Sequence, residues 1–145
     1  MIEVCDDAER IRPLLDEWYE EQEGAVFGMD MNVDAYIKDM NRWLGNLGGI
    51  ILIAFEESVL VGFMTLIIVP SEFGNQTWCI EKGWYVRPRS KSSGIRLYRK
   101  AENWCREKGC SHLIMTASRG ASSLHDKLCR FYERMEMKQL ETSYA

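Results

Sequence analysis

Residues 82–100 read KGWYVRPRSKSSGIRLYRK, an apolar run followed by a basic turn and a helical pattern. The segment holds seven basic residues and no acidic one, although the whole chain has a formal net charge of −4. A turn of small residues leaves backbone N–H groups free, and the next helix adds unpaired N–H groups and the positive end of its dipole. The segment therefore predicts an anion site that suits a phosphate-bearing cofactor. The other interpretation is a helix face that is merely basic and solvated.

Charge is distributed unevenly along the chain. Residues 1–57 hold fourteen acidic and four basic residues, a net charge of −10. Because this part repels anions, no nucleic acid partner is expected. It would suit a cationic substrate, or its carboxylates form only a solvated helix face. Around the anion site the backbone would be reinforced by four cations, Arg87, Arg89, Lys91 and Arg96.

Length and composition fit a single globular domain over residues 1–145. Hydrophobic residues make up 46% of the chain and charged residues 28%, which is ordinary for such a domain. No apolar run approaches the roughly 20 residues of a transmembrane helix, and the acidic first residues do not resemble a signal peptide. We therefore expect a cytoplasmic protein without a membrane partner.

Cysteine and histidine usage argues against a metal site and against a disulfide framework. The chain has five cysteines and two histidines, and no two cysteines form a Cys-x-x-Cys pair. We expect reduced thiols that pack in the core rather than act as nucleophiles, among them Cys79, Cys105 and Cys129.

Hydrophobic periodicity predicts two helices in the first third of the chain. One covers about residues 6–23, provided that Pro13 lies in its first turn. The other follows Asn32 and ends at Gly45 or at the glycine pair 48–49. Aromatic residues at helical spacing indicate a core interface, with an acceptor pocket as the alternative; they are Trp18, Tyr19, Tyr36 and Trp43.

Strands and helices then alternate. Two runs, 50–55 and 59–69, are apolar at nearly every position, and a polar turn joins them into an antiparallel hairpin covered on both faces. The later elements are a strand at 77–86, a helix at about 94–108, a strand at 111–117, a helix from a capping box at 123–126 to about 135, and a strand at 137–144. The order α-α-β-β-β-α-β-α-β predicts an α/β (α+β) domain with helices on both faces of a mixed central sheet.

This order, with a basic turn after the third strand, resembles the GNAT superfamily of acetyl-CoA-dependent N-acetyltransferases. In that family a strand ends in Val-x-Pro, and the amides of an Arg-x-x-Gly-x-Gly/Ala loop hold the pyrophosphate of CoA. Residues 86–88 match the first pattern, and residues 91–96 match the second with Lys91 for arginine and Arg96 for a small residue. The resemblance implies acetyl-CoA as the cofactor, bound along Tyr85, Val86, Lys91, Ser92, Ser93, Gly94, Ile95 and Arg96.

A second family motif, Tyr-x-x-x-Gly-Phe, resembles residues 131–137, with Tyr132 in the tyrosine place and Glu136 in the glycine place. The resemblance implies that the Tyr132 hydroxyl protonates the departing thiolate, and the alternative is a half-buried core tyrosine. Seven residues before this tyrosine many members have an asparagine that contacts the cofactor. Here the residue is His125, either a cofactor contact or a surface residue beside the helix cap.

Glu81 is the candidate for the general base. Family members frequently place a glutamate on this strand, and Glu81 is its only acid, able to take the proton of the amine directly or through water. Strict alternation would put Glu81, Gly83 and Tyr85 on one face, but the resemblance implies a bulge here. The alternative for Glu81 is an ion pair with Lys82 or another cation at the surface.

The leading hypothesis is an N-acetyltransferase that moves an acetyl group to a primary amine of a small molecule or protein by direct attack on the thioester. The second is a degenerate relative that binds CoA or a partner protein, because Arg96 and Glu136 stand where small residues are usual. The third, a small nucleic-acid binder, would require strongly salt-dependent binding. Acceptor choice would fall to the first two helices and the loops 71–76 and 116–122. Dimers are common among similar proteins, so a homodimer is also open.

Overall fold

The computed structural model describes residues 1–22, 28–30, 32–118 and 124–144. Its centre is a five-stranded sheet with the strand order β1-β2-β3-β4-β5. Neighbouring strands are antiparallel except β4 and β5, which are parallel. The predicted mixed sheet is therefore confirmed, and its strands are β1 (Ile2–Cys5), β2 (Gly49–Glu56), β3 (Val59–Pro70), β4 (Thr77–Val86) and β5 (His112–Ile114).

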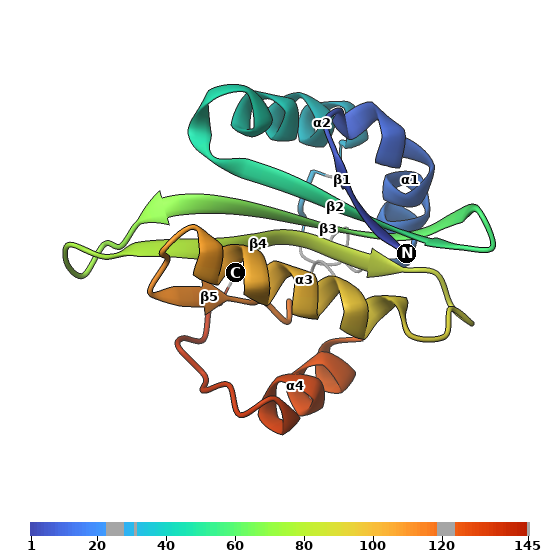
Figure 1. Ribbon diagram of the computed structural model, residues 1–145. Helices are drawn as coiled ribbons and strands as arrows, with labels where there is room; N and C mark the ends of the chain where they lie inside the picture. The colour runs from blue at the N-terminus through green and yellow to red at the C-terminus, as the bar shows by residue number, and fades with distance from the viewer. Residues whose placement is uncertain (23–27, 31, 119–123, 145) are drawn as a thin grey trace.

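Helices cover both faces of the sheet (Figure 1). On one face lie a 3-10 turn, η1 (Ala8–Ile11), and the helices α1 (Arg12–Glu21) and α2 (Val33–Arg42), which continues into a π-helical turn, η3 (Trp43–Leu47). On the other face lie α3 (Ser93–Glu107) and α4 (His125–Arg134). No helix of the described residues combines the length and the apolar character that a membrane span would need.

The sheet separates two hydrophobic cores. Ile51, Ile53 and Phe63 pack with residues of α1 and α2 on one side. Leu52, Met64 and residues of α3 form the core on the other side. Successive strand residues point to opposite faces, so both faces of β2 and β3 are apolar because both are covered. The predicted two-sided burial of this hairpin is confirmed.

Local signals mark several element ends as predicted. Pro13 lies in the first turn of α1, and the Asn32 side chain caps α2 by accepting a hydrogen bond from the Ala35 N–H at 3.0 Å. The helical segment that includes α2 ends at Gly48, whose φ of 81° is left-handed.

Two predictions about strands are wrong. Strand β1 was not predicted; it pairs with β2, with Ile2 opposite Ala54, and so occupies one sheet edge. Residues 137–144 form no strand. Met137 packs against the α3 core and its sulfur accepts a hydrogen bond from the Tyr98 hydroxyl at 3.6 Å, whereas residues 138–144 are exposed.

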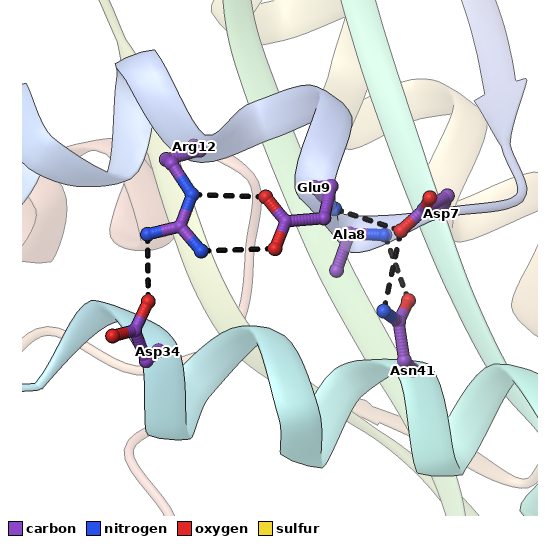
Figure 2. Close-up of polar contacts among 6 residues, drawn as sticks. All are labelled: Asp7, Ala8, Glu9, Arg12, Asp34 and Asn41. Atoms are coloured by element: carbon purple, nitrogen blue, oxygen red, sulfur yellow. Dashed lines mark hydrogen bonds and ion pairs between the residues drawn. The ribbon is translucent and has the colours of Figure 1, made fainter.

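Several acidic residues near the N-terminus have a structural role (Figure 2). Asp7 accepts hydrogen bonds from the Glu9 N–H at 2.9 Å and from the Asn41 amide at 3.2 Å, which ties η1 to α2. Arg12 joins Glu9 at 2.9 Å and Asp34 at 2.8 Å. These carboxylates therefore stabilise the packing of η1, α1 and α2.

Candidate active site

The candidate site begins where β4 and β5 separate. The two strands are paired only as far as Ile80 and Ile114, although β4 continues to Val86. The predicted strand at 111–117 is therefore paired over three residues only. Two parallel strands that part in this way leave backbone groups of both strands unpaired and open a gap between the sheet halves.

A bulge in β4 lies at the same place. Leu66 of β3 is opposite Glu81, but the next residue, Thr65, is opposite Gly83, so Lys82 is the extra residue. Cross-strand partners share a face, and Leu66 belongs to the α3 core while Thr65 contacts Tyr36 of α2. Glu81 is therefore on the α3 side and Gly83 on the α2 side. The expected bulge is confirmed, and strict alternation does not hold.

Gly83 is packed so closely that a side chain would not fit. A Cβ atom there would collide with the Tyr36 hydroxyl and lie 3.0 Å from the Trp18 ring. The Tyr36 hydroxyl is hydrogen bonded to Thr65 Oγ1 at 2.5 Å. Trp18, Tyr19 and Tyr36 are in mutual ring contact and pack against the α1 and α2 core, as the core interpretation of these aromatics predicts. Trp18 and Tyr36 pack against Gly83 from the α1 and α2 side of the sheet and so fix the position of the bulge.

The Glu81 carboxylate is buried beside the bulge, with 7% of the residue exposed. Its two oxygens accept a hydrogen bond from Thr116 Oγ1 at 3.4 and 3.3 Å. Burial raises the pKa of Glu81 to about 7, while the hydrogen bonds from Thr116 and the nearby charge of Lys82 oppose the rise. A carboxyl group with this pKa is a proton acceptor at neutral pH. The surface ion pair considered for Glu81 does not match its burial.

Tyr132, on α4, is hydrogen bonded to Thr116, the residue that also contacts Glu81. Its hydroxyl donates a hydrogen bond to the Thr116 carbonyl oxygen at 2.6 Å. Burial raises the pKa of Tyr132, and the negative charge of Glu81 raises it further. The phenol therefore keeps its proton at neutral pH. Glu81 and Tyr132, 51 positions apart in sequence, are joined through one threonine.

Sequence reasoning did not assign Thr116 this role. It placed residue 116 in a loop that would help to select the acceptor, because a small polar residue after a short strand has no distinctive pattern. What reveals Thr116 is geometry: its side chain faces Glu81 and its carbonyl faces Tyr132. No periodicity or motif carries that information.

The basic turn leads directly into α3. Ser92 precedes the helix and makes no side-chain cap, and the first intrahelical bond runs from the Arg96 N–H to the Ser92 carbonyl at 3.1 Å. In the described part of the chain, the N–H groups of residues 93–95 have no partner. A Cβ atom at Gly94 would lie 3.8 Å from Trp84 and Val86, which is an ordinary contact. The turn therefore offers unpaired donors without crowding.

The cations around this turn are not equivalent. Arg87 forms an ion pair with Glu17 of α1 at 2.7 Å and also donates to the Leu60 carbonyl, so the expected contribution of Arg87 to the anion site is wrong. Arg96 and Lys91 are exposed. The backbone N–H of Lys91 donates to the Glu56 carboxylate at 2.9 Å. A negatively charged side chain of the protein itself therefore already lies at the turn.

Three further predicted contacts have partners within the chain. The Tyr85 side chain lies on the α1 side, where its hydroxyl donates to Glu17 and Glu21 at 3.3 Å, so only its backbone faces the gap in the sheet. Val86 packs against the α3 core. Both ring nitrogens of His125 are engaged, Nδ1 with the Ala117 carbonyl at 2.5 Å and Nε2 with Cys129 Sγ at 3.6 Å.

The backbone conformation of Glu136 explains why the family motif has glycine at this position. Its φ is 60°, the left-handed region that favours glycine. The Glu136 N–H bonds to the Glu133 carbonyl and the Met137 N–H to the Tyr132 carbonyl, both at 3.0 Å, which is a Schellman ending. The helix α3 ends in the same way with Gly109 at φ 72°. Glu136 thus adopts the glycine conformation at some cost.

Comparisons with known proteins agree with this geometry. A family model described as the acetyltransferase (GNAT) family matches residues 11–137. A search of curated proteins gives no match. Among the described residues, no group of three or more histidine, cysteine or acidic side chains is placed to hold a metal ion.

Solved structures share the fold at low sequence identity. A ribosomal-protein-alanine N-acetyltransferase from Brucella melitensis biovar Abortus 2308 is 20% identical, with a TM-score of 0.72 over 100% of this chain and 97% of that chain. The aminoglycoside N-acetyltransferase AAC(6')-Iy in complex with CoA is 17% identical, with a TM-score of 0.75 over 100% and 91%. A transcriptional regulator from Bacillus halodurans C-125 is 13% identical, with a TM-score of 0.75 over 100% and 98%. Since the family model spans most of the sequence, this chain belongs to the acetyltransferase (GNAT) family.

Proposed function

We propose that this GNAT acetyltransferase uses acetyl-CoA to acetylate a primary amine of a small molecule or protein, with Glu81 as general base and Tyr132 as general acid. The observation that carries the proposal is the junction at Thr116. It brings a buried carboxyl group with a pKa of about 7 next to a phenol that keeps its proton. A carboxyl group that titrates near neutrality beside a phenol that stays protonated is typical of acid–base catalysis.

The chain offers donors that suit the cofactor. The unpaired N–H groups of residues 93–95 fit a pyrophosphate at the start of α3, with Lys91 and Arg96 adding charge. Between this turn and Tyr132 lies Trp84, whose indole N–H is buried without a partner in the described residues. That donor fits an amide carbonyl of the pantetheine arm. When bound, acetyl-CoA supplies a thioester that an amine can attack.

Glu81 would prepare the amine. An amine attacks only when it is neutral, so the ammonium proton must leave first. The Glu81 carboxylate is half ionised near pH 7 and accepts that proton on one of its oxygens. The Thr116 hydroxyl orients the carboxylate and stabilises its charged form.

Tyr132 would donate a proton to the leaving thiolate sulfur. Its O–H now donates to the Thr116 carbonyl and would have to exchange that acceptor for the developing thiolate. The raised pKa keeps the proton on the phenol oxygen until such a negative charge appears. His125 stays a proposed cofactor contact, and it would have to exchange one of its two present partners.

The acceptor is proposed only as a class. Solved structures that share the fold include enzymes named for a ribosomal-protein alanine and for aminoglycosides, so protein N-terminal amines and amino sugars are the first acceptors to test. Glu17 and Glu21 of α1 already bond to Arg87 and Tyr85, while the exposed Asp16 and Glu20 of the same helix support a cationic acceptor. We further propose a cytoplasmic location, as the composition predicts, and keep a homodimer as an open proposal.

The test combines binding with turnover. Titration calorimetry with acetyl-CoA should give a saturable binding heat, and Tyr132→Phe should keep that binding while kcat falls by about a hundredfold. Tyr144→Phe is the matched control, because Tyr144 is 93% exposed and should leave both quantities unchanged. The proposal fails if the folded protein shows no binding at millimolar acetyl-CoA, or if Tyr132→Phe has full kcat.

A further inference from the structure

A cysteine and a histidine form a hydrogen-bonded pair on α4. Cys129 Sγ lies 3.6 Å from His125 Nε2, and His125 Nδ1 contacts the Ala117 carbonyl oxygen at 2.5 Å. A carbonyl oxygen can only accept, so Nδ1 carries the ring hydrogen. The lone pair of Nε2 is therefore left to accept the thiol proton. A nucleophile, a base and a group that orients the base are the elements of an activated thiol.

The other cysteines lack this arrangement. Cys5, Cys79 and Cys105 are buried, with at most 5% exposed, and burial raises the pKa of Cys105 to about 11. Cys110 is partly exposed like Cys129, but it lies beside Cys105. Within the described residues, Cys129 is the one thiol hydrogen bonded to an imidazole. Cys110 is thus a natural internal control.

We propose that Cys129 is a thiol–disulfide exchange site for low-molecular-weight disulfides. His125 Nε2 takes the thiol proton, and the Cys129 sulfur attacks one sulfur of the disulfide. A new S–S bond forms to Cys129 while the S–S bond of the disulfide breaks, and the second sulfur departs with the electron pair and is protonated. The disulfide is the oxidant in this step. Cys129 is only partly exposed, which favours a small disulfide.

The exchange would also affect the acetyltransferase site, and this part rests on the proposed function. Cys129 and Tyr132 are three positions apart on α4, so they share a helix face. Both Tyr132 and His125 bond to neighbouring carbonyls, those of Thr116 and Ala117. A mixed disulfide at Cys129 would therefore lie beside the Tyr132 hydroxyl, and a reductant would remove it.

The experiment uses the intact, folded protein at neutral pH and the dianionic aromatic disulfide dithiobis(nitrobenzoate), with peptide mass mapping. We expect one fast thiol, at Cys129, which Cys129→Ser abolishes and Cys110→Ser leaves intact. His125→Asn and His125→Gln should each slow the fast phase about tenfold or more, with an unchanged circular dichroism spectrum. A fast phase that survives in Cys129→Ser, or an unslowed rate in both folded His125 variants, overturns the proposal. Because labelling is read by mass, its outcome is independent of whether the enzyme turns over.

Discussion

Replacing Glu81 by glutamine should change both the pH dependence of stability and that of catalysis. The pKa of Glu81 is raised from 4.5 to about 7 because the carboxyl group is buried. One pKa unit corresponds to about 1.4 kcal/mol, so ionising this group in the folded protein costs up to about 3 kcal/mol. The folded state therefore binds its proton more tightly than the unfolded state does.

The sign of the effect follows from that difference. The contribution of Glu81 to stability is fully present below about pH 4.5 and is lost as the pH rises through about 7. Glutamine is neutral at every pH and can still bond to Thr116. Glu81→Gln should thus gain about 2–3 kcal/mol relative to the wild type between pH 5 and pH 8, measured by urea unfolding at several pH values.

Turnover should respond to the same group. The wild-type kcat/KM should rise with pH through an inflection near 7, as the carboxylate forms. Glu81→Gln should lower kcat/KM by about a hundredfold or more and remove the inflection. Glu102→Gln is the matched control, because Glu102 lies at the surface of α3 and pairs with Arg106. A variant that keeps the inflection, together with a stability difference that does not vary with pH, would refute the reasoning.

Four other substitutions test separate parts of the structure. Thr116→Val removes the hydroxyl that bonds to Glu81, and the inflection of kcat/KM should move up by about one pH unit. Glu136→Gly should raise the free energy of unfolding by about 1 kcal/mol, because the φ of Glu136 is 60°; the control Arg130→Gly, in the middle of α4, should lower it by a similar amount. Gly83→Ala should lower that free energy by about 1–3 kcal/mol, since a Cβ atom meets Tyr36, and an unchanged urea midpoint would contradict this packing. Glu56→Gln should tighten acetyl-CoA binding a few-fold in calorimetry, because a carboxylate leaves the turn, and the gain should shrink in high salt.

Local patterns were enough to predict most of the secondary structure. The β2–β3 hairpin, the strand β4 and the helix α3 follow from runs and periodicities of eight to fifteen residues, and each lies within a few residues of its predicted bounds. Such signals are readable because backbone propensity and one-sided or two-sided burial act within a single element. The motif around Gly94 likewise pointed to the acetyltransferase family from residues that are close in sequence. Strand β1 escaped prediction because four residues at a sheet edge carry little pattern.

The arrangement of the site depended on contacts between distant segments. From the sequence, Arg87 was expected to add charge to the anion site, but Glu17, 70 positions away, lies beside it. Glu81 could be either a general base or a surface acid until the structure showed that it is buried and that burial raises its pKa. Thr116 acquires its role only because β5 leaves β4 after Ile114 and α4 returns to the gap. The sequence alone determined most of the elements and the family they belong to, since those depend on short-range order. The tertiary structure decided which groups are desolvated and paired, because desolvation and pairing are properties of neighbours that the chain brings together only by folding.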